Sequence, residues 1–288
     1  GFVSSFAHCA ARFATFSAVH PIEHLRYVAR AHGVDPAALV EETAHALGAL
    51  SMDPAGLVVA CRRFVERHPF SGPLWWLSAN AVTSSEPFEA VWELAEQIRM
   101  DRTAAELGAA LPDDGDVVTI GDPHTIAQGL ARRGDVRVLA LDVDHSATSF
   151  VRRLERHDVD YEPVDAGAAG SVCRSGDVVL VEALAVDESV AIVPSGSSTI
   201  AAAATAWSAP SWLVAGVGRR LPGAFDEAMV AKRAALVEDA DDWSVDVEVV
   251  PASMFTHVVG PHGAAPMGPP AVRPECPVAA ELLRDVAM

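Results

Sequence analysis

The stretch Asp177-Val178-Val179-Leu180-Val181-Glu182-Ala183-Leu184 decides the fold class of this chain. Its apolar run is rich in β-branched residues, begins after Gly176-Asp177 and is followed by the carboxylate of Glu182. A short unbroken run of this kind is typical of a β-strand that is buried on both faces. Such strands belong to parallel sheets that helices cover, so the stretch predicts an α/β fold with a largely parallel sheet.

A second short strand, at 191–193, runs into a loop of small residues that opens an alanine-rich helix. The N-terminus of a helix presents unpaired N–H groups and the positive end of the helix dipole, which favour an anion. The sequence therefore predicts a phosphate-binding loop formed by Ser195, Gly196, Ser197, Ser198 and Thr199. Plain helix capping is the alternative for the same residues, because Ser and Thr are common N-caps.

Strand and helix patterns alternate over the second half of the chain. Segments with strand character are 117–120, 136–141, 159–164, 178–182, 191–193, 212–215 and 245–250. Helical patterns lie between several of them, at 124–133, 146–158, 166–173 and 199–208. This alternation predicts right-handed β-α-β crossovers and a Rossmann-like, doubly wound, mostly parallel sheet.

The first hundred residues have helical periodicity throughout, punctuated by Pro and Gly. A turn-rich junction, Leu111-Pro-Asp-Asp-Gly115, separates them from the strand patterns. The predicted division is an unassigned segment at 1–20, a helical N-terminal domain at 21–110, a Rossmann-like domain at 111–265, and a Pro-rich segment with a C-terminal helix at 266–288.

Composition excludes several classes of function. The 288 residues carry a formal charge of −18, which repels nucleic acid and anionic membranes, and the basic residues are scattered. Cysteines 9, 61, 173 and 276 form no Cys-x-x-Cys pair, so we expect neither a metal site nor disulfides. No stretch approaches the ~20 apolar residues of a membrane span, and no signal peptide is evident. We expect a cytoplasmic protein without nucleic-acid or membrane partners.

Polar side chains follow several predicted strands at their carboxyl ends, where ligands bind in doubly wound sheets. They are Gly121, Asp122 and His124 after the first strand, Asp142, Asp144 and His145 after the second, and Glu182 after the fourth. Carboxylates beside a histidine form a usable general acid–base set, because repulsion and burial push their pKa values apart. We expect the four acids to be candidate catalytic residues and Gly121, His124 and His145 to contact the ligand. As an alternative, Asp122, Asp142 and Asp144 cap the helices that follow them.

Glu182 is the strongest single candidate, because an acid directly after a buried strand needs a partner, a ligand or an exit to solvent. One interpretation makes it a general acid or base with a pKa that burial raises. The other makes it a structural carboxylate held by a backbone or arginine partner.

Residues 20–263 resemble the alpha, beta and delta subunits of translation initiation factor 2B and the related methylthioribose-1-phosphate and ribose-1,5-bisphosphate isomerases. Matching segments are Asp116 to Ile120, Val179-Leu-Val-Glu-Ala-Leu184, Val193-Pro-Ser-Gly-Ser197, and Val247 to Pro251 with Val258-Val-Gly-Pro-His-Gly263. The resemblance lies in order, spacing and hydrophobic pattern. It implies a helical N-terminal domain before a Rossmann-like domain.

The chain departs from that family where the isomerases carry their chemistry. Gly121 stands at the position of the catalytic cysteine, and Leu184 at that of the catalytic aspartate. Val193 and Pro194 stand near the family's Asn-Lys pair, and the segment from Asp142 to His145 replaces a phosphate-binding arginine. The resemblance therefore implies a relative that binds a phosphorylated sugar or nucleotide without isomerase chemistry or a cofactor. The alternative is a sugar-phosphate isomerase that uses the replaced acids.

The resemblance also implies an oligomer, since related proteins commonly dimerise through the large domain. Apolar residues at Trp207, Trp212 and 214–217 are candidates for a homodimer surface. The alternative is that these tryptophans belong to the core.

Overall fold

The computed structural model describes residues 36–48, 53–142 and 147–284. The sequence predictions for residues 1–20, for the start of the helical domain at 21–35, and for Asp144 and His145 lie outside these residues.

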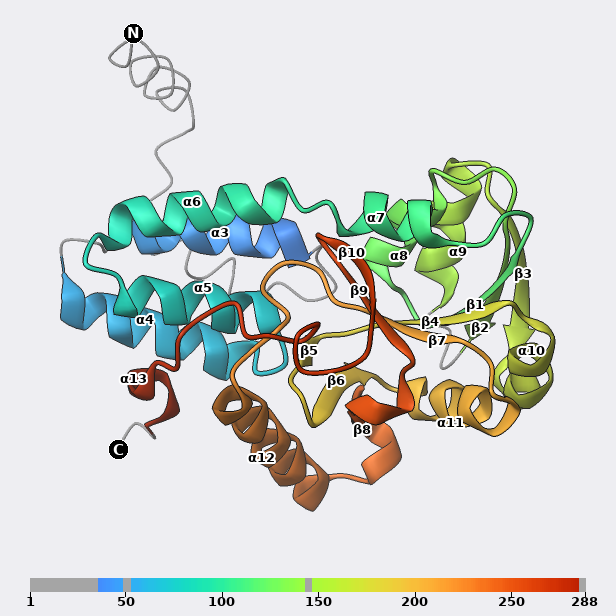
Figure 1. Ribbon diagram of the computed structural model, residues 1–288. Helices are drawn as coiled ribbons and strands as arrows, with labels where there is room; N and C mark the ends of the chain where they lie inside the picture. The colour runs from blue at the N-terminus through green and yellow to red at the C-terminus, as the bar shows by residue number, and fades with distance from the viewer. Residues whose placement is uncertain (1–35, 49–52, 143–146, 285–288) are drawn as a thin grey trace, which may run out of the picture.

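Four helices form a bundle that lies to one side of the sheet (Figure 1). They are α3 (Pro36–Gly48), α4 (Pro54–Arg67), α5 (Gly72–Thr83) and α6 (Pro87–Arg99). Proline occupies the first or second position of α4, α5 and α6, where the backbone N–H has no helical partner in any case. The N-cap of α4 is Asp53, whose side chain accepts the N–H of Gly56 at 3.0 Å.

The bundle ends with α6 at Arg99, and a further helix, α7 (Thr103–Ala110), begins after a short break. Asp101 lies in that break and accepts hydrogen bonds from the backbone N and Oγ1 of Thr103, at 2.8 and 2.6 Å. These bonds stabilise the start of α7 and turn the chain from the bundle toward the sheet.

A seven-stranded sheet forms the other part of the molecule, in the order β10-β9-β7-β4-β1-β2-β3. Its strands are β1 (Asp116–Ile120), β2 (Arg137–Asp142), β3 (Asp160–Asp165), β4 (Val178–Glu182), β7 (Ser211–Val214), β9 (His257–Gly260) and β10 (Gly263–Pro266). All neighbouring strands are parallel except the β9–β10 pair. The predicted mostly parallel α/β sheet is confirmed.

Both faces of the sheet are covered, as the apolar run in β4 predicts. Val178 and Leu180 pack into a cluster with α7, α8 (His124–Leu130) and α9 (Ala147–Arg156). Val179 and Val181 face the other side, where they pack with α10 (Ala169–Ser175) and α11 (Ser197–Trp207). Successive side chains of a strand point to opposite faces, so every residue of β4 is buried.

The prediction that 191–193 and 245–250 belong to the parallel sheet is wrong. They correspond to β6 (Val190–Pro194) and β8 (Val247–Pro251), which form a separate antiparallel sheet with β5 (Ala185–Val186). A parallel pair requires a crossover of a dozen or more residues, and only residues 183–189 separate β4 from β6. The loop after β6 therefore does not lie at the carboxyl edge of the main sheet.

Among the elements that the sequence patterns missed are β5, β9, β10 and α12 (Gly223–Asp239). Phe225 and Met229 of α12 are buried against the helical bundle, with the Phe225 ring 5.0 Å from that of Trp75, whereas Leu236 is exposed. The apolar residues of α12 do not recur on one helical face, which removes the signal that predicts an amphipathic helix.

The apolar residues expected at a dimer surface divide into two sets. Val214 and Ala215 are fully buried, so interpreting them as exposed is wrong: they lie at the end of the covered strand β7. Trp212 is half-buried, and its ring centroid lies 5.9 Å from that of His257. Trp207 on α11 is exposed and lies beneath the guanidinium of Arg174.

Among the helices that the structure describes, none combines the length and the apolar character needed to cross a membrane.

Candidate functional site

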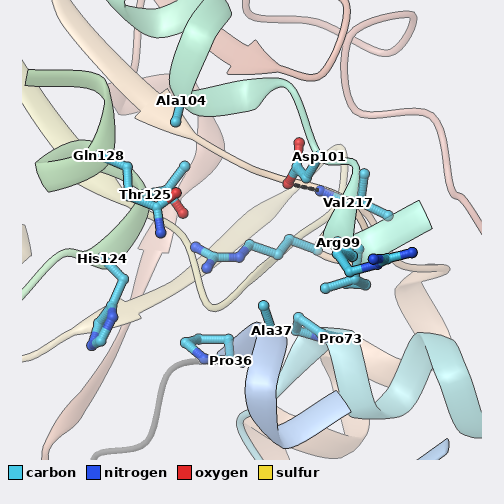
Figure 2. Close-up of a pocket in the computed structure, with 12 residues that line it drawn as sticks. Pro36, Ala37, Pro73, Arg99, Asp101, Ala104, His124, Thr125, Gln128 and Val217 are labelled. Carbon is cyan, nitrogen blue, oxygen red and sulfur yellow. Dashed lines mark hydrogen bonds between the residues drawn. The ribbon is translucent and has the colours of Figure 1, made fainter. Parts of the chain in front are cut away.

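A cavity of about 200 Å³ lies between the helical bundle and the carboxyl edge of the parallel sheet. Figure 2 shows His124, Thr125 and Gln128 on one side of it and Asp101 and Val217 on another. The described residues that line it are Pro36, Ala37, Pro73, Ile98, Arg99, Asp101, Ala104, His124, Thr125, Gln128, Val217 and Arg219. The segments that follow β1 and β7 both contribute, as expected for the ligand edge of a doubly wound sheet.

The turn after β1 brings α8 to the cavity. Gly121 has a φ of +75°, a backbone conformation that glycine adopts without strain, and the chain then enters α8 at His124. His124 and Thr125 line the cavity. Asp122 points elsewhere: it forms an ion pair with Arg153 of α9. Asp142 ends β2 opposite Asp165 of β3 and does not line the cavity.

Glu182 is bonded on both oxygens and is only 7% exposed. Its Oε2 accepts the N–H groups of Thr125 and Ile126 at 2.8 and 3.3 Å. Its Oε1 accepts the hydroxyl of Thr125 at 2.9 Å and lies 2.8 Å from Nη1 of Arg219. The carboxylate thus holds the first turn of α8 and the segment after β7 in fixed relative positions, and through them two side chains of the cavity wall.

Arg219 is also 7% exposed along its side chain and donates a second bond from Nη1 to the carbonyl of Ala183, at 2.6 Å. Within the described parts of the chain, no protein acceptor is within hydrogen-bond distance of its Nε or Nη2. Those two groups retain donors for a ligand that enters the cavity, because a guanidinium carries five N–H donors.

Asp101 lines the cavity, but both of its oxygens are bonded. Oδ1 accepts from the backbone N and the hydroxyl of Thr103, and Oδ2 accepts from the backbone N of Val217 at 2.9 Å. The remaining charged group of the lining, Arg99, is paired with Glu96 on the exposed face of α6. Both guanidiniums of the lining are paired with carboxylates outside it, Arg219 with Glu182 and Arg99 with Glu96, so the described lining has no excess of positive charge. What it offers an anionic ligand is the pair of N–H donor groups that Arg219 keeps unbonded within the described parts of the chain.

The loop for which the sequence predicts phosphate binding lies on the small sheet and not in this cavity. Gly196 is the N-cap of α11, with a φ of +86°. The N–H groups of Gly196 and Ser198 donate to the two carboxylate oxygens of Glu248, at 3.0 and 2.7 Å. The sequence pattern therefore identified backbone N–H groups that bind an anion. In the folded chain that anion is the carboxylate of Glu248 in β8.

The sequence patterns did not single out Arg219, Arg99, Asp101, Thr125 or Gln128 as site residues. One usable signal existed for Arg219, because Gly216-Val-Gly-Arg-Arg220 directly follows a predicted buried strand at 212–215. Glycines and an arginine at the carboxyl end of a parallel strand are typical of a ligand-binding loop.

Thiol and metal chemistry find little support in the described residues. Cys61, Cys173 and Cys276 are buried, and burial raises the pKa of the Cys61 and Cys276 thiols to about 12 and that of Cys173 to about 11. A buried, protonated thiol is a poor nucleophile. In the described residues, no group of three or more His, Cys, Asp and Glu side chains is arranged to hold a metal ion.

No protein-family model and no curated protein matches this chain in sequence. Solved structures do match it in fold. Translation initiation factor eIF-2B from Pyrococcus horikoshii OT3 superposes with a TM-score of 0.71 at 14% identity, over 88% of this chain and 98% of that one. A chain of the tetrameric eIF2B-beta2-delta2 complex from C. thermophilum gives 0.66 at 13% identity, over 85% and 90%.

An enzyme has the same fold. The 5-methylthioribose 1-phosphate isomerase from Pyrococcus horikoshii OT3 superposes with a TM-score of 0.61 at 13% identity, over 88% of this chain and 85% of that one. These likenesses confirm the fold that the sequence resemblance implies, a helical region followed by a mostly parallel α/β sheet.

Proposed function

We propose that this chain, which has the fold of eIF2B subunits and of 5-methylthioribose 1-phosphate isomerase, binds a phosphorylated sugar without isomerising it. The observation that carries the proposal is that no described residue accepts from two donor groups of Arg219, Nε and Nη2, in the lining of the cavity. Arg219 and Arg99 line it, and Asp101, the single carboxylate among the described lining residues, is bonded at both oxygens. A phosphoryl group supplies acceptor oxygens for the Nε and Nη2 donors of Arg219.

Arg219 is the residue that we expect to hold the phosphoryl group. A guanidinium is planar and can bind two phosphoryl oxygens at once. Glu182 and the carbonyl of Ala183 already fix Nη1, so little side-chain entropy is lost when the ligand binds. His124, Thr125 and Gln128 also line the cavity and provide polar groups for sugar hydroxyls.

The size of the cavity favours a sugar monophosphate over a nucleotide. The described residues enclose about 200 Å³. Pockets for drug-sized molecules have volumes of roughly 300–1,000 Å³, so this one suits a smaller ligand. A base attached to the sugar would need space beyond that enclosed.

At the two positions where the related isomerases carry their catalytic residues, this chain has no side chain that can act as an acid or a base. Gly121 has no side chain, and Leu184 packs against the helical bundle while its carbonyl accepts the N–H of Gly72 at 3.1 Å. Glu182 has both oxygens engaged by the protein. Aldose–ketose isomerisation moves a proton between adjacent carbons and needs an acid and a base at fixed positions.

A second candidate function is isomerase activity with His124 as the base. The observation in its favour is that His124 lines the cavity beside Arg219, and an imidazole can both accept and donate a proton. Asp122 is less suited to this role, because it is paired with Arg153.

A thermal-shift panel tests the binding proposal. The probes are ribose 5-phosphate, methylthioribose 1-phosphate, adenosine monophosphate, ribose and inorganic phosphate. We expect the sugar phosphates to raise the melting temperature most, since a ligand at ~100 times its Kd stabilises the folded state by ~2.7 kcal/mol. Equal stabilisation by ribose and ribose 5-phosphate, or none by any phosphorylated probe, contradicts the proposal.

A double variant that removes both members of the Glu182–Arg219 pair tests the role of Arg219. Glu182→Gln with Arg219→Met leaves no buried charge unpaired, so the double variant should fold and lose the response to sugar phosphates.

Proton NMR of the wild type incubated with each aldose phosphate separates the two functions. Appearance of the ketose, and its loss in His124→Gln, establishes the isomerase.

A further inference from the structure

Arg219 lies in a loop, residues 216–221, whose backbone is bonded by three separate parts of the chain besides the end of β4, which holds the Arg219 side chain. From the break between α6 and α7, Asp101 accepts the N–H of Val217 at 2.9 Å. From β5, the N–H of Val186 donates to the carbonyl of Arg219 at 2.8 Å. The third part is the segment after β10, which contributes Glu275.

Glu275 brackets Arg219 on both sides. Its Oε2 accepts the backbone N–H groups of Gly218 and Arg220, at 2.8 and 3.4 Å. Its Oε1 accepts from Nη2 of Arg220 at 2.5 Å, and its own backbone N–H donates to the carbonyl of Arg220 at 2.9 Å. The Glu275 and Arg220 side chains are 18% and 13% exposed, so water screens these bonds weakly.

The side of the loop opposite Glu275 is tightly packed. Gly218 has a φ of +79°, and a Cβ atom there would lie 3.1 Å from Cα of Pro73 and 3.2 Å from the ring of Trp76, both in α5. The backbone at Gly218 is therefore confined between α5 and the Glu275 carboxylate. Removal of that carboxylate leaves the N–H groups of Gly218 and Arg220 without their acceptor and opens the side of the loop that Glu275 covers.

The segment that carries Glu275 also contacts the helical bundle. Beyond Glu275 the chain reaches α13 (Ala280–Leu283), which packs on α4, and Nε of Arg62 donates to the carbonyl of Glu281 at 2.6 Å. Glu275 is thus anchored from one side by the bundle and from the other by the strands β9 and β10.

Resting on the proposed function, we propose that Glu275 is a positioning residue for Arg219, and that the C-terminal segment thereby sets the preference of the cavity for phosphorylated over unphosphorylated sugars. Glu275 does not line the cavity, so it acts on a ligand only through the backbone on either side of Arg219. A guanidinium binds two phosphoryl oxygens only in a narrow range of orientations, which makes affinity sensitive to this loop.

The test measures the Kd of ribose 5-phosphate and of ribose by calorimetry in the wild type, Glu275→Ala and Glu275→Gln. We expect Glu275→Ala to raise the Kd of ribose 5-phosphate at least tenfold and to leave the Kd of ribose unchanged, so that the ratio of the ribose Kd to the ribose 5-phosphate Kd falls. Glu275→Gln keeps one carbonyl oxygen for Gly218 and should lower the ratio about threefold. A wild-type ratio in Glu275→Ala overturns the inference, and if that variant does not fold, a wild-type ratio in Glu275→Gln does so.

The control for a purely structural effect is Arg233→Ala. Arg233 joins α12 to β8 through the carbonyl of Val247 at 2.6 Å and pairs with Asp242, away from the loop. It should lower the melting temperature and keep the wild-type ratio. An equal fall of the ratio in Arg233→Ala overturns the inference.

Wild-type protein that binds no sugar phosphate overturns the proposed function and this inference with it, whereas binding that Glu275→Ala leaves unchanged overturns the inference alone.

Discussion

Oε1 of Glu182 lies 2.8 Å from Nη1 of Arg219, and each side chain is 7% exposed. The pair joins the end of β4 to the segment after β7, and the same carboxylate holds the N–H groups of Thr125 and Ile126 in α8. One side chain therefore connects three neighbouring elements at the carboxyl edge of the sheet. Two of the residues that it holds, Thr125 and Arg219, line the cavity.

Glu182→Ala should lower the free energy of unfolding by ~3–5 kcal/mol, because it leaves the buried Arg219 charge without its partner. Glu182→Gln keeps the shape of the side chain and one acceptor oxygen, and replaces the other oxygen by an NH2 group that faces donors. It should cost less, ~1–3 kcal/mol. Urea unfolding of both variants measures the difference. A general acid or base would behave differently, with wild-type stability and lost turnover in Glu182→Gln.

The control for this prediction is an exposed pair on the same sheet. Arg137 lies 2.7 Å from Asp116, with exposures of 46% and 28%. Arg137→Gln should cost ~1 kcal/mol or less, since exposed ion pairs contribute little. Equal losses in Arg137→Gln and Glu182→Ala would show that burial of the Glu182 pair has no energetic consequence.

Local pattern was sufficient to predict β4, because an unbroken apolar run carries its own evidence of burial on both faces. It was insufficient for the site, where the decisive bonds join residues far apart in the sequence. Glu248 is 52 positions from Gly196, and Glu275 is 57 positions from Gly218. No periodicity relates such residues, so the sequence could predict that Gly196 to Thr199 take an anion but not that Glu248 supplies it.

The same limit explains why β6 and β8 were assigned to the wrong sheet. Their apolar character predicted strands, which is correct, but which strand pairs with which depends on the length of the intervening chain. Arg219 was overlooked for the opposite reason. Its basic pair is one of several along the chain, and the glycines before it indicate a loop but not its partner, since Glu182 lies far away in the sequence.

Asp226 should make stability depend on pH. Its side chain is fully buried, neither oxygen has a partner among the described residues, and burial together with the nearby Asp187 carboxylate raises its pKa from 3.8 to about 8. The folded state therefore binds a proton that the unfolded chain releases above pH ~4. Its contribution to stability is complete below pH ~4, is lost as the pH rises, and has disappeared above about pH 8.

Asp226→Asn cannot release that proton, so the fall in the free energy of unfolding between pH 5 and pH 8 should shrink by up to ~1.4 kcal/mol per pH unit. Urea titrations at four pH values measure the slope. Asp113→Asn is the control, because the Asp113 side chain is 96% exposed and its removal should leave the slope unchanged. An unchanged slope in Asp226→Asn would mean that Asp226 is charged in the folded protein.

Glu248→Ala should expose the backbone donors at the start of α11. The loss of the carboxylate that accepts from Gly196 and Ser198 should cost ~1–2 kcal/mol, the usual contribution of a helix N-cap. Sulfate should return part of this stability in the variant and have less effect on the wild type, because the freed N–H groups bind an anion. The exposed neighbour Asp246 provides the control: Asp246→Ala should show neither the loss nor the recovery.

Gly218→Ala should lower both stability and affinity for ribose 5-phosphate. The φ of +79° is unfavourable for any residue with a Cβ atom, and that atom would press on Pro73 at 3.1 Å, so we expect a loss of ~1–3 kcal/mol in the free energy of unfolding. Because Gly218 precedes Arg219, the same shift should weaken ligand binding. Gly134→Ala is the matched control, since a Cβ atom there meets nothing within 4 Å, and its stability and Kd should equal those of the wild type. Wild-type affinity in a destabilised Gly218→Ala would show that the backbone at Gly218 does not determine where the Arg219 guanidinium lies.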